Sequence, residues 1–134
     1  EIECSVLGNS NPIASVPGEI VPLADFYSYD AKYIDGEAAR LDIPARLSSN
    51  EVSRIQKLSV DAYTALCCEG MARVDSFLTA SGEIFINEIN TIPGFTRISM
   101  YPKLWEASGL SYAALIDKLV ELASERHSEQ KHLG

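Results

Sequence analysis

The chain has 134 residues, of which 46% are hydrophobic, and its formal net charge is -8 at pH 7. A chain of this length buries roughly two-thirds of its unfolded surface, so the sequence predicts one globular domain with a substantial core. The negative charge repels polyanions and argues against nucleic acid or an anionic membrane as a partner. No stretch is apolar enough to span a bilayer or to act as an export leader, so we expect a cytoplasmic location.

The first half of the chain is typical of short strands followed by a helix. Alternation predicts a strand from Glu1 to Leu7, and prolines bound a second one from Pro17 to Pro22. An aromatic-rich loop follows at about 23–36, and a loop of this length inside a compact domain is usually functional. An edge strand near "AARLDIPA" precedes a helix that Ser48 or Ser49 caps. The apolar stripe expected on this helix is Val52, Ile55, Leu58, Ala62, Ala65 and Leu66.

The second half begins with a β-hairpin signal. Two strands at about Met71–Leu78 and Glu83–Asn90 flank the turn sequence "TASG". A loop then leads to a short helix near Lys103–Ala107 and a longer one from Ser111 to about Glu125. Residues 127–134 have no apolar period, so we expect a frayed polar tail there. The pattern predicts a mixed α/β (α+β) fold, with a mostly antiparallel sheet and packed helices.

Two further features concern the setting of the chain. The cysteines are Cys4, Cys67 and Cys68, and an odd number that includes two neighbours suits reduced, structural thiols better than a disulfide framework. The chain begins at Glu1, without methionine and already inside an alternating run. We therefore expect a fragment of a longer protein.

The polar residues of the hairpin form one group if its loop has two or four residues. Arg73 then lies opposite Glu88, and Asp75 lies opposite Ile86. Directly opposed residues share a face of the sheet, and successive side chains alternate between faces. The polar face would carry Arg73, Asp75, Glu88 and Asn90. The core face would carry Val74, Leu78, Phe85 and Ile89. A loop of three residues would break up both sets.

This polar face has the chemistry of a cation site. Asp75 and Glu88 would be diagonal neighbours, with Cα atoms roughly 7 to 8 Å apart, so that both carboxylates can reach one small ion. Together with Asn90 they form an oxygen-only set, which suits Mg²⁺ better than zinc. The alternative is that these carboxylates and Arg73 form surface ion pairs. The "PG" that follows the hairpin could present backbone N–H groups to an anion, or form an ordinary tight turn.

Three segments carry a family resemblance: "FYSYDAKYIDG", "EGMARVDSFL" and "GEIFINEINTIPGFTRISMYP". Together they resemble the carboxy-terminal part of D-alanine-D-alanine ligases, enzymes of the ATP-grasp fold, over nearly all of the chain. The combination of R-x-D with N-E-x-N-T-x-P-G is specific to this family, whereas D…E-x-N alone recurs in ATP-grasp enzymes with other substrates. The resemblance implies an ATP-grasp carboxy-terminal subdomain over residues 1–126, with a substrate-closing loop at about 23–36 and a metal-binding hairpin at 70–96.

The resemblance also implies a reaction and its cofactors. ATP, as co-substrate, would phosphorylate one D-alanine, and the amine of a second D-alanine would attack the acyl phosphate. The product, D-alanyl-D-alanine, would serve peptidoglycan precursor synthesis and so cell wall biogenesis and cell shape. Two Mg²⁺ or Mn²⁺ ions are implied, one held by Asp75 and Glu88 and the other by Glu88 and Asn90.

Roles for the oxyanion and for the second substrate follow from the same resemblance. Arg73 and the backbone N–H of Gly94 would stabilise the oxyanion of the tetrahedral intermediate, although Arg73 could merely neutralise Glu88. Ser99 and the backbone N–H of Met100 would bind the carboxylate of the second D-alanine. The alternative for Ser99 is an ordinary serine at the approach to a helix.

Three more residues are implied in binding ATP and closing the site. Lys32 would reach the terminal phosphate, and Tyr33 would close the aromatic loop over the second substrate and exclude water. Glu1 would bind the ribose hydroxyls of ATP, or it could be a frayed end. Relatives that make a D-alanine-D-lactate product carry histidine at the position of Tyr33, so the tyrosine favours an amine acceptor.

The chain departs from the family pattern in some places. Cys67 stands where glycine is common, and Arg97 stands where proline or a small polar residue is usual. The amino-terminal portion that would hold the first D-alanine and grip ATP is missing, so we expect an inactive part of an enzyme that is a homodimer at full length. The alternatives are an ATP-grasp ligase for another acid and amine, including D-lactate, and a non-catalytic module with a structural cation.

Overall fold

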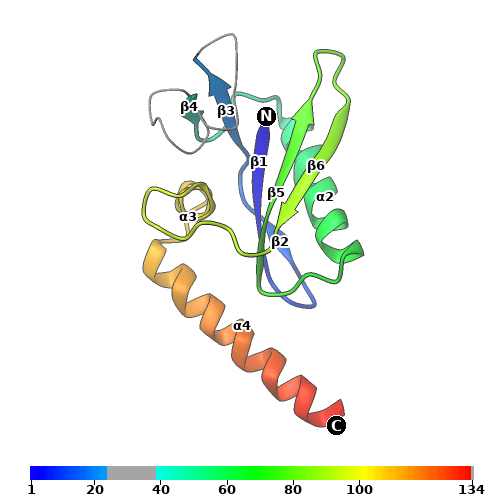
Figure 1. Cartoon of the computed structure of the whole chain (residues 1–134), viewed down its shortest axis with the longest axis vertical. Coiled ribbons are helices and arrows are strands. Elements are labelled where there is room, and N and C mark those ends of the chain that lie inside the picture. The colour runs from blue at the N-terminus through cyan, green and yellow to red at the C-terminus, as the bar shows by residue number, and fades with distance from the viewer. Residues whose placement is uncertain (24–38, 134) are drawn as a thin grey trace.

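The computed structural model describes residues 1–23 and 39–133. Over these residues the chain forms a six-stranded sheet in the order β4-β3-β1-β5-β6, with β2 paired to β1 (Figure 1). Every recorded strand pair is antiparallel. Helices pack on the sheet, so the predicted mixed fold with a mostly antiparallel sheet is confirmed. The strands are β1 (Ile2–Leu7), β2 (Ile13–Ala14), β3 (Gly18–Pro22), β4 (Ala39–Asp42), β5 (Met71–Leu78) and β6 (Ile84–Asn90).

Strand β1 is the central strand and divides the core between two faces. Its six residues are all buried, because β3 and β5 flank it and helices cover it. On one face Ile2, Cys4 and Val6 pack with residues of α2 (Ser49–Ala65). On the other face Leu7 packs with α3 (Met100–Ala107) and α4 (Tyr112–Leu133). Burying each large apolar side chain contributes about 1.5 to 3 kcal/mol.

Helix α2 begins as the sequence indicates and buries a different stripe. Ser48 caps it in a capping box with Glu51, which satisfies two backbone N–H groups at the helix start. The buried line is Ile55, Ser59 and Tyr63, whose hydroxyl donates to the carbonyl of Gly8 at 2.8 Å. The expected stripe was therefore wrong at its end: Ala65 and Leu66 are exposed.

The end of α2 explains an unusual residue. Cys67 has φ +54°, the left-handed conformation, and its N–H donates to the carbonyl of Thr64 while the N–H of Cys68 donates to that of Tyr63. This pattern is the Schellman motif, in which glycine is the usual residue at the left-handed position. All three cysteines are free thiols, with Cys4 buried and Cys67 exposed.

Helix α4 is longer than the sequence predicts. It runs to Leu133, so the expectation of a frayed tail at residues 127–134 was wrong for 127–133, although these residues are exposed. The apolar contacts end at Leu122, but the following "SERHSEQKHL" has no proline or glycine and contains good helix formers, which continue the helix without packing.

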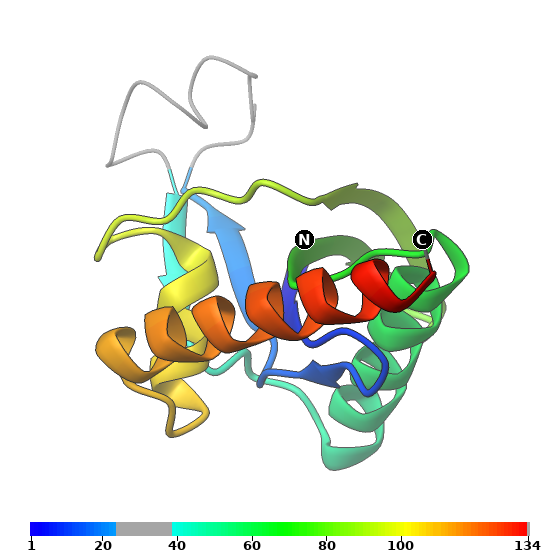
Figure 2. The same cartoon turned by 90° about the horizontal axis from the view of Figure 1, so that it is seen from below.

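Figure 2 shows α4 running across the molecule from the side of α3 toward the end of α2. Polar contacts hold its second half: Asn9 donates to the carbonyl of Leu122 at 2.9 Å, and Arg126 pairs with Glu69. In the described part of the chain, no helix is both long and apolar enough to cross a membrane.

Candidate active site on the central strands

The register of the β5–β6 hairpin differs from the one expected. Near the turn Leu78 pairs with Ile84, which leaves residues 79–83 as a loop with an odd number of residues. The register then shifts between Ser76 and Asp75, where a bulge leaves Asn87 without a Cα partner. Beyond the bulge Asp75 lies directly opposite Glu88, and Arg73 lies opposite Asn90. The expected pairs of Arg73 with Glu88 and of Asp75 with Ile86 were therefore wrong.

The polar group nevertheless survives the change of register. An odd loop alone would have turned Glu88 to the opposite face, and the bulge adds the one residue that turns it back. The core face differs from the expected one at a single position. Ile84 packs with Leu78 against the α2 core, whereas Phe85, expected in the core, is 54% exposed. Phe85 pairs with Phe77, so both aromatic rings lie on the polar face near the hairpin tip.

Strand β1 adds a third member to this polar face. Glu3 is the Cα partner of Asp75 on β1, just as Glu88 is its partner on β6. The three acidic residues therefore form a row across three neighbouring strands, with Asp75 in the middle. In the adjacent row Arg73 lies between Ser5 and Asn90. Directly opposed side chains in a sheet are roughly 5 Å apart at Cβ, close enough to interact along each row.

The two carboxylates nearest to Arg73 are buried and bound to it. Arg73 Nε and Nη2 donate to the two oxygens of Asp75 at 2.7 and 2.8 Å, and Nε lies 3.1 Å from Glu3 Oε2. The side chain of Asp75 is fully buried, and that of Glu3 is 3% exposed. The hydrogen bond that Arg73 donates to Asp75 raises the pKa of Arg73 above its ordinary value, burial opposes this rise, and the charge of Glu3 adds to it. Arg73 therefore stays protonated.

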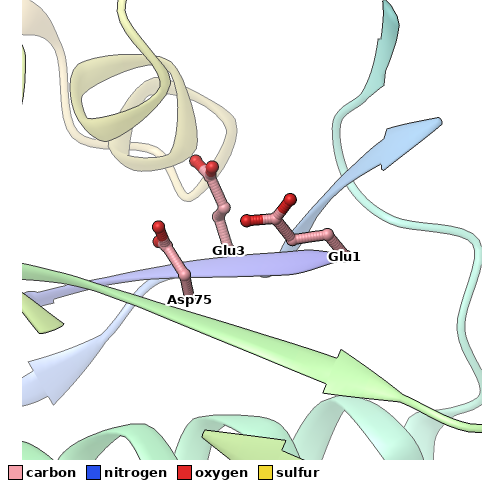
Figure 3. Close-up of side chains that lie close together, drawn as sticks. All are labelled: Glu1, Glu3 and Asp75. Carbon is pink, nitrogen blue, oxygen red and sulfur yellow. The ribbon is translucent and has the colours of Figure 1, made fainter. Parts of the chain in front are cut away.

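Glu1 joins the same cluster. One carboxylate oxygen from each of Glu1, Glu3 and Asp75 lies within 4.8 Å of the others. Figure 3 shows the three side chains on the same side of the sheet, away from α2. Among the described residues this is the group of acidic, histidine and cysteine side chains with spacing suited to a metal ion, although Arg73 already neutralises part of its charge. The sequence motifs predicted a role for Glu1 and none for Glu3.

Glu3 could have been found only from strand pairing. It alternates with Glu1 on the predicted first strand, a pattern that normally places charged residues on a solvated face. The position becomes buried because β1 lies between β3 and β5 and because α3 covers that side: a side-chain carbon added to Gly18, the Cα partner of Glu3 on β3, would lie 2.8 Å from Leu104. These are long-range contacts, which periodicity does not reveal.

The loop after β6 brings Gly94 against Ser99. A Cβ at Gly94 would lie 3.1 Å from Ser99 Oγ, closer than side-chain carbons usually approach. Ser99 Oγ accepts a hydrogen bond from the N–H of Thr96 at 3.0 Å and lies 2.8 Å from Thr96 Oγ1. Ser99 also has the extended conformation of a helix N-cap, and Met100 is the first residue of α3. The two residues expected to bind substrate thus lie at a helix start that directly contacts Gly94.

The same loop is held to α4 by Tyr112. The Tyr112 hydroxyl donates to the carbonyl of Phe95 at 2.9 Å, and the two rings lie 5.4 Å apart. The guanidinium carbon of Arg97 lies 5.7 Å from the Tyr112 ring centroid, a cation–π contact. Arg97, unusual for the pattern expected there, is thus accommodated by Tyr112. Lys32 and Tyr33 lie outside the described residues.

Comparison with known proteins identifies the family of the chain. A family model described as the D-ala D-ala ligase C-terminus matches residues 1–121. The chain belongs to this family. It is 62% identical over 133 residues to a D-alanine--D-alanine ligase of Oceanobacillus iheyensis, covering 99% of this chain and 36% of the relative.

Solved structures give the same assignment. The D-alanine-D-alanine ligase of Coxiella burnetii matches with a TM-score of 0.85 and 48% identity, over 98% of this chain and 34% of that one. The D-alanine--D-alanine ligase of Bacillus anthracis, solved in complex with ATP, matches with a TM-score of 0.77 and 30% identity, over 96% of this chain and 41% of that one. The family member described here thus spans about a third of the length of these ligases.

Proposed function

We propose that this chain is the carboxy-terminal third of an ATP-dependent ligase that joins two D-alanines for peptidoglycan precursor synthesis. The observation that carries the proposal is the polar row in which Asp75 lies between Glu3 and Glu88, with Arg73 and Asn90 paired in the adjacent row. This arrangement gathers carboxylates, an amide and a fixed cation on one face of the sheet. The names of the relatives support the substrates, and the ATP complex of the Bacillus anthracis ligase supports the nucleotide.

The donor set fits a hard divalent cation. Asp75 and Glu88 are direct Cα partners, Glu88 is exposed, and half-buried Asn90 adds an amide oxygen, so the donors are the oxygens that Mg²⁺ and Mn²⁺ prefer. We propose that Asp75 and Glu88 hold one ion and that Glu88 and Asn90 hold a second. Such ions, when bound, neutralise phosphate oxygens and favour phosphoryl transfer.

Arg73 and Gly94 are proposed to stabilise the oxyanion that forms when the amine attacks the acyl phosphate. Arg73 keeps its charge beside Asp75 and Glu3, so it offers a fixed positive group on the polar face. Gly94 has no side chain to shield its backbone N–H. Removing one oxyanion donor typically costs about 3 kcal/mol of transition-state stabilisation.

The start of α3 is proposed to bind the carboxylate of the second D-alanine. A helix start favours an anion because its first backbone N–H groups have no partner within the helix. The side chain of Ser99 makes no cap hydrogen bond to α3, and its Oγ is shared with Thr96. Ser99 Oγ and the N–H of Met100 would together receive the carboxylate.

The remaining residue roles are inferred from similarity to the family. We propose that Lys32 contacts the terminal phosphate, that Tyr33 closes the loop over the acceptor amine, and that Glu1 binds the ribose. Residues beyond this chain would hold the first D-alanine and the other side of ATP, in a homodimeric, cytoplasmic enzyme. The chain alone would then be inactive.

A chimaera tests this function directly. The matching 133 residues of the Oceanobacillus relative are replaced by this chain, and phosphate release and dipeptide formation are measured with ATP, Mg²⁺ and D-alanine. We expect D-alanyl-D-alanine, and no product with D-lactate as acceptor at neutral pH. A folded chimaera that releases no phosphate with D-alanine would overturn the proposal.

The metal sites need their own variants. Asp75→Ala combined with Glu88→Ala should abolish ligation and weaken Mn²⁺ binding measured by electron paramagnetic resonance. Asp61→Ala, which removes an exposed aspartate of α2, is the matched control and should change neither. Unaltered Mn²⁺ affinity in the double variant would remove Asp75 and Glu88 from the proposed site.

A further inference from the structure

Glu3 is a buried carboxylate to which the proposed function gives no task. It lies on the central strand, is almost fully buried, and is flanked by β5 on one side and by Gly18 of β3 on the other. Helix α3 lies over the neighbouring Gly18, where an added side-chain carbon would meet Leu104 and Met100. Burying a carboxylate is costly unless a cation compensates it, and such a group is retained only where its partner is well placed.

Among the described residues, Glu3 forms an ion pair with Arg73. Glu3 Oε2 lies 3.1 Å from Arg73 Nε, and the same guanidinium binds Asp75 through Nε and Nη2. One guanidinium is therefore shared by two carboxylates from adjacent strands. The two hydrogen bonds to Asp75 fix the plane of the guanidinium, and Glu3 adds an ion pair from the adjacent strand, in which Oε2 accepts no hydrogen bond from Arg73.

The two acids differ in what else they can reach. On β6, Asp75 has Glu88 as its Cα partner, which belongs to the proposed cation site. On β3, Glu3 has Gly18 as its Cα partner, which offers no side-chain ligand. A cation bound between Asp75 and Glu88 would compete with Arg73 for the carboxylate of Asp75 and weaken the contact between these two residues. Glu3, sealed under α3, would keep its contact with Arg73 unchanged.

We infer that Glu3 is a positioning residue, which holds the Arg73 guanidinium toward the reacting carbonyl while Asp75 serves the cation. The inference rests on the proposed function, because it assumes that Arg73 contacts the oxyanion. It assigns no metal to Glu3.

The test uses a double-mutant cycle in the chimaera. Glu3→Gln keeps the shape of the side chain and removes its charge, and Arg73→Lys keeps the charge and removes the fork. We expect Glu3→Gln alone to lower kcat by about 10- to 100-fold, with the KM for ATP and the Mn²⁺ affinity nearly unchanged, since a misplaced catalytic group has effects of this order. In the Arg73→Lys background, Glu3→Gln should lower kcat by less than about threefold, because the effects of substitutions at interacting residues are not additive.

Two control variants separate this inference from a purely structural role. Glu19→Gln removes a half-buried acid on the opposite face of β3 and should leave kcat unchanged. Glu3→Asp keeps the charge, should recover part of the lost kcat, and serves as the test variant if Glu3→Gln does not fold. Equal losses of kcat from Glu3→Gln in both backgrounds would overturn the inference, and so would a fall in Mn²⁺ affinity.

A readout independent of ligation distinguishes this inference from the proposed function. Hydrogen exchange of the Arg73 Nε–H group, followed by NMR with ¹⁵N-labelled arginine and assigned with Arg73→Lys, should become about tenfold faster in Glu3→Gln. An unchanged exchange rate would contradict the role of Glu3 even in an inactive chimaera. A chimaera without ligase activity in which exchange does accelerate would contradict the proposed function alone.

Discussion

Tyr112, the first residue of α4, donates its hydroxyl hydrogen to the carbonyl of Phe95, 17 residues earlier in the chain. This bond ties the loop that carries Gly94 and Ser99 to a helix that packs on the core through Leu115 and Leu122. The loop is therefore held from both of its ends, by β6 before it and by α3 after it, and from the side by Tyr112.

Removal of this hydroxyl should loosen the loop. Tyr112→Phe keeps the ring contacts with Phe95 and Arg97 and leaves the Phe95 carbonyl without its partner, so we expect the free energy of unfolding to fall by about 1 kcal/mol. Urea denaturation measures this change. Glu121→Gln, which removes one exposed ion pair of α4, is the control and should change stability by less than about 0.5 kcal/mol. Equal stability of Tyr112→Phe and the parent would show that the bond contributes nothing.

A methyl group at Gly94 should disturb Ser99. The Cβ of Gly94→Ala would lie 3.1 Å from Ser99 Oγ, so we expect the KM for D-alanine in the chimaera to rise about tenfold or more while the protein stays folded. The loss of stability should be smaller in a Ser99→Ala background, because the nearest atom is then absent. Full stability and an unchanged KM for Gly94→Ala would contradict this account of the loop.

The cysteine at the end of α2 is a site for stabilisation. Cys67 holds φ at +54°, which costs a residue with a side chain more than it costs glycine, so Cys67→Gly should raise the free energy of unfolding by roughly 0.5 to 1 kcal/mol. Its neighbour is a matched control: Cys68 has no positive φ and packs against the core, so Cys68→Gly should destabilise the protein. Thermal unfolding of the two variants should shift in opposite directions.

The capping box of α2 predicts a dependence on pH. The hydrogen bond from the backbone of Ser48 lowers the pKa of Glu51, followed in effect by the bond from the Ser48 hydroxyl. A carboxyl with a lowered pKa stabilises the folded state above its unfolded pKa of about 4.3, and this contribution is lost as the pH falls through the folded value. The stability difference between the parent and Glu51→Gln should therefore be constant near neutral pH and shrink in acid. A difference that grows below pH of about 4 would contradict the sign.

Local patterns predicted most of the secondary structure. Alternation located β1, the bounding prolines located β3, the turn sequence located the hairpin strands, and a capping serine at 48 or 49 marked the start of α2. The prediction failed where contacts distant in the sequence decide the outcome. Tyr63 is buried because it reaches Gly8, and the end of α4 follows helix propensity rather than apolar packing.

The grouping of Arg73, Asp75, Glu88 and Asn90 on one face of the hairpin was predicted, whereas the register that produces it was not. The set on the polar face was expected from an even loop, whereas the chain reaches it with an odd loop and a bulge, which no turn motif in "TASG" reveals. The burial of Glu3 depends on which strand pairs with β5, a choice between partners that are far apart in the sequence. The roles assigned to all of the site residues, including Lys32 and Tyr33, remain predictions.

The bulge at Asn87 has a consequence for how the hairpin can vary. Residues on the two sides of it follow different registers, so the tip from 77 to 85 and the base that holds Asp75 opposite Glu88 are set independently. A residue gained or lost in the turn at 79–83 can be compensated at this one irregular position, without changing which acids meet across the strands. Length variation at the tip is thereby uncoupled from the chemistry at the base.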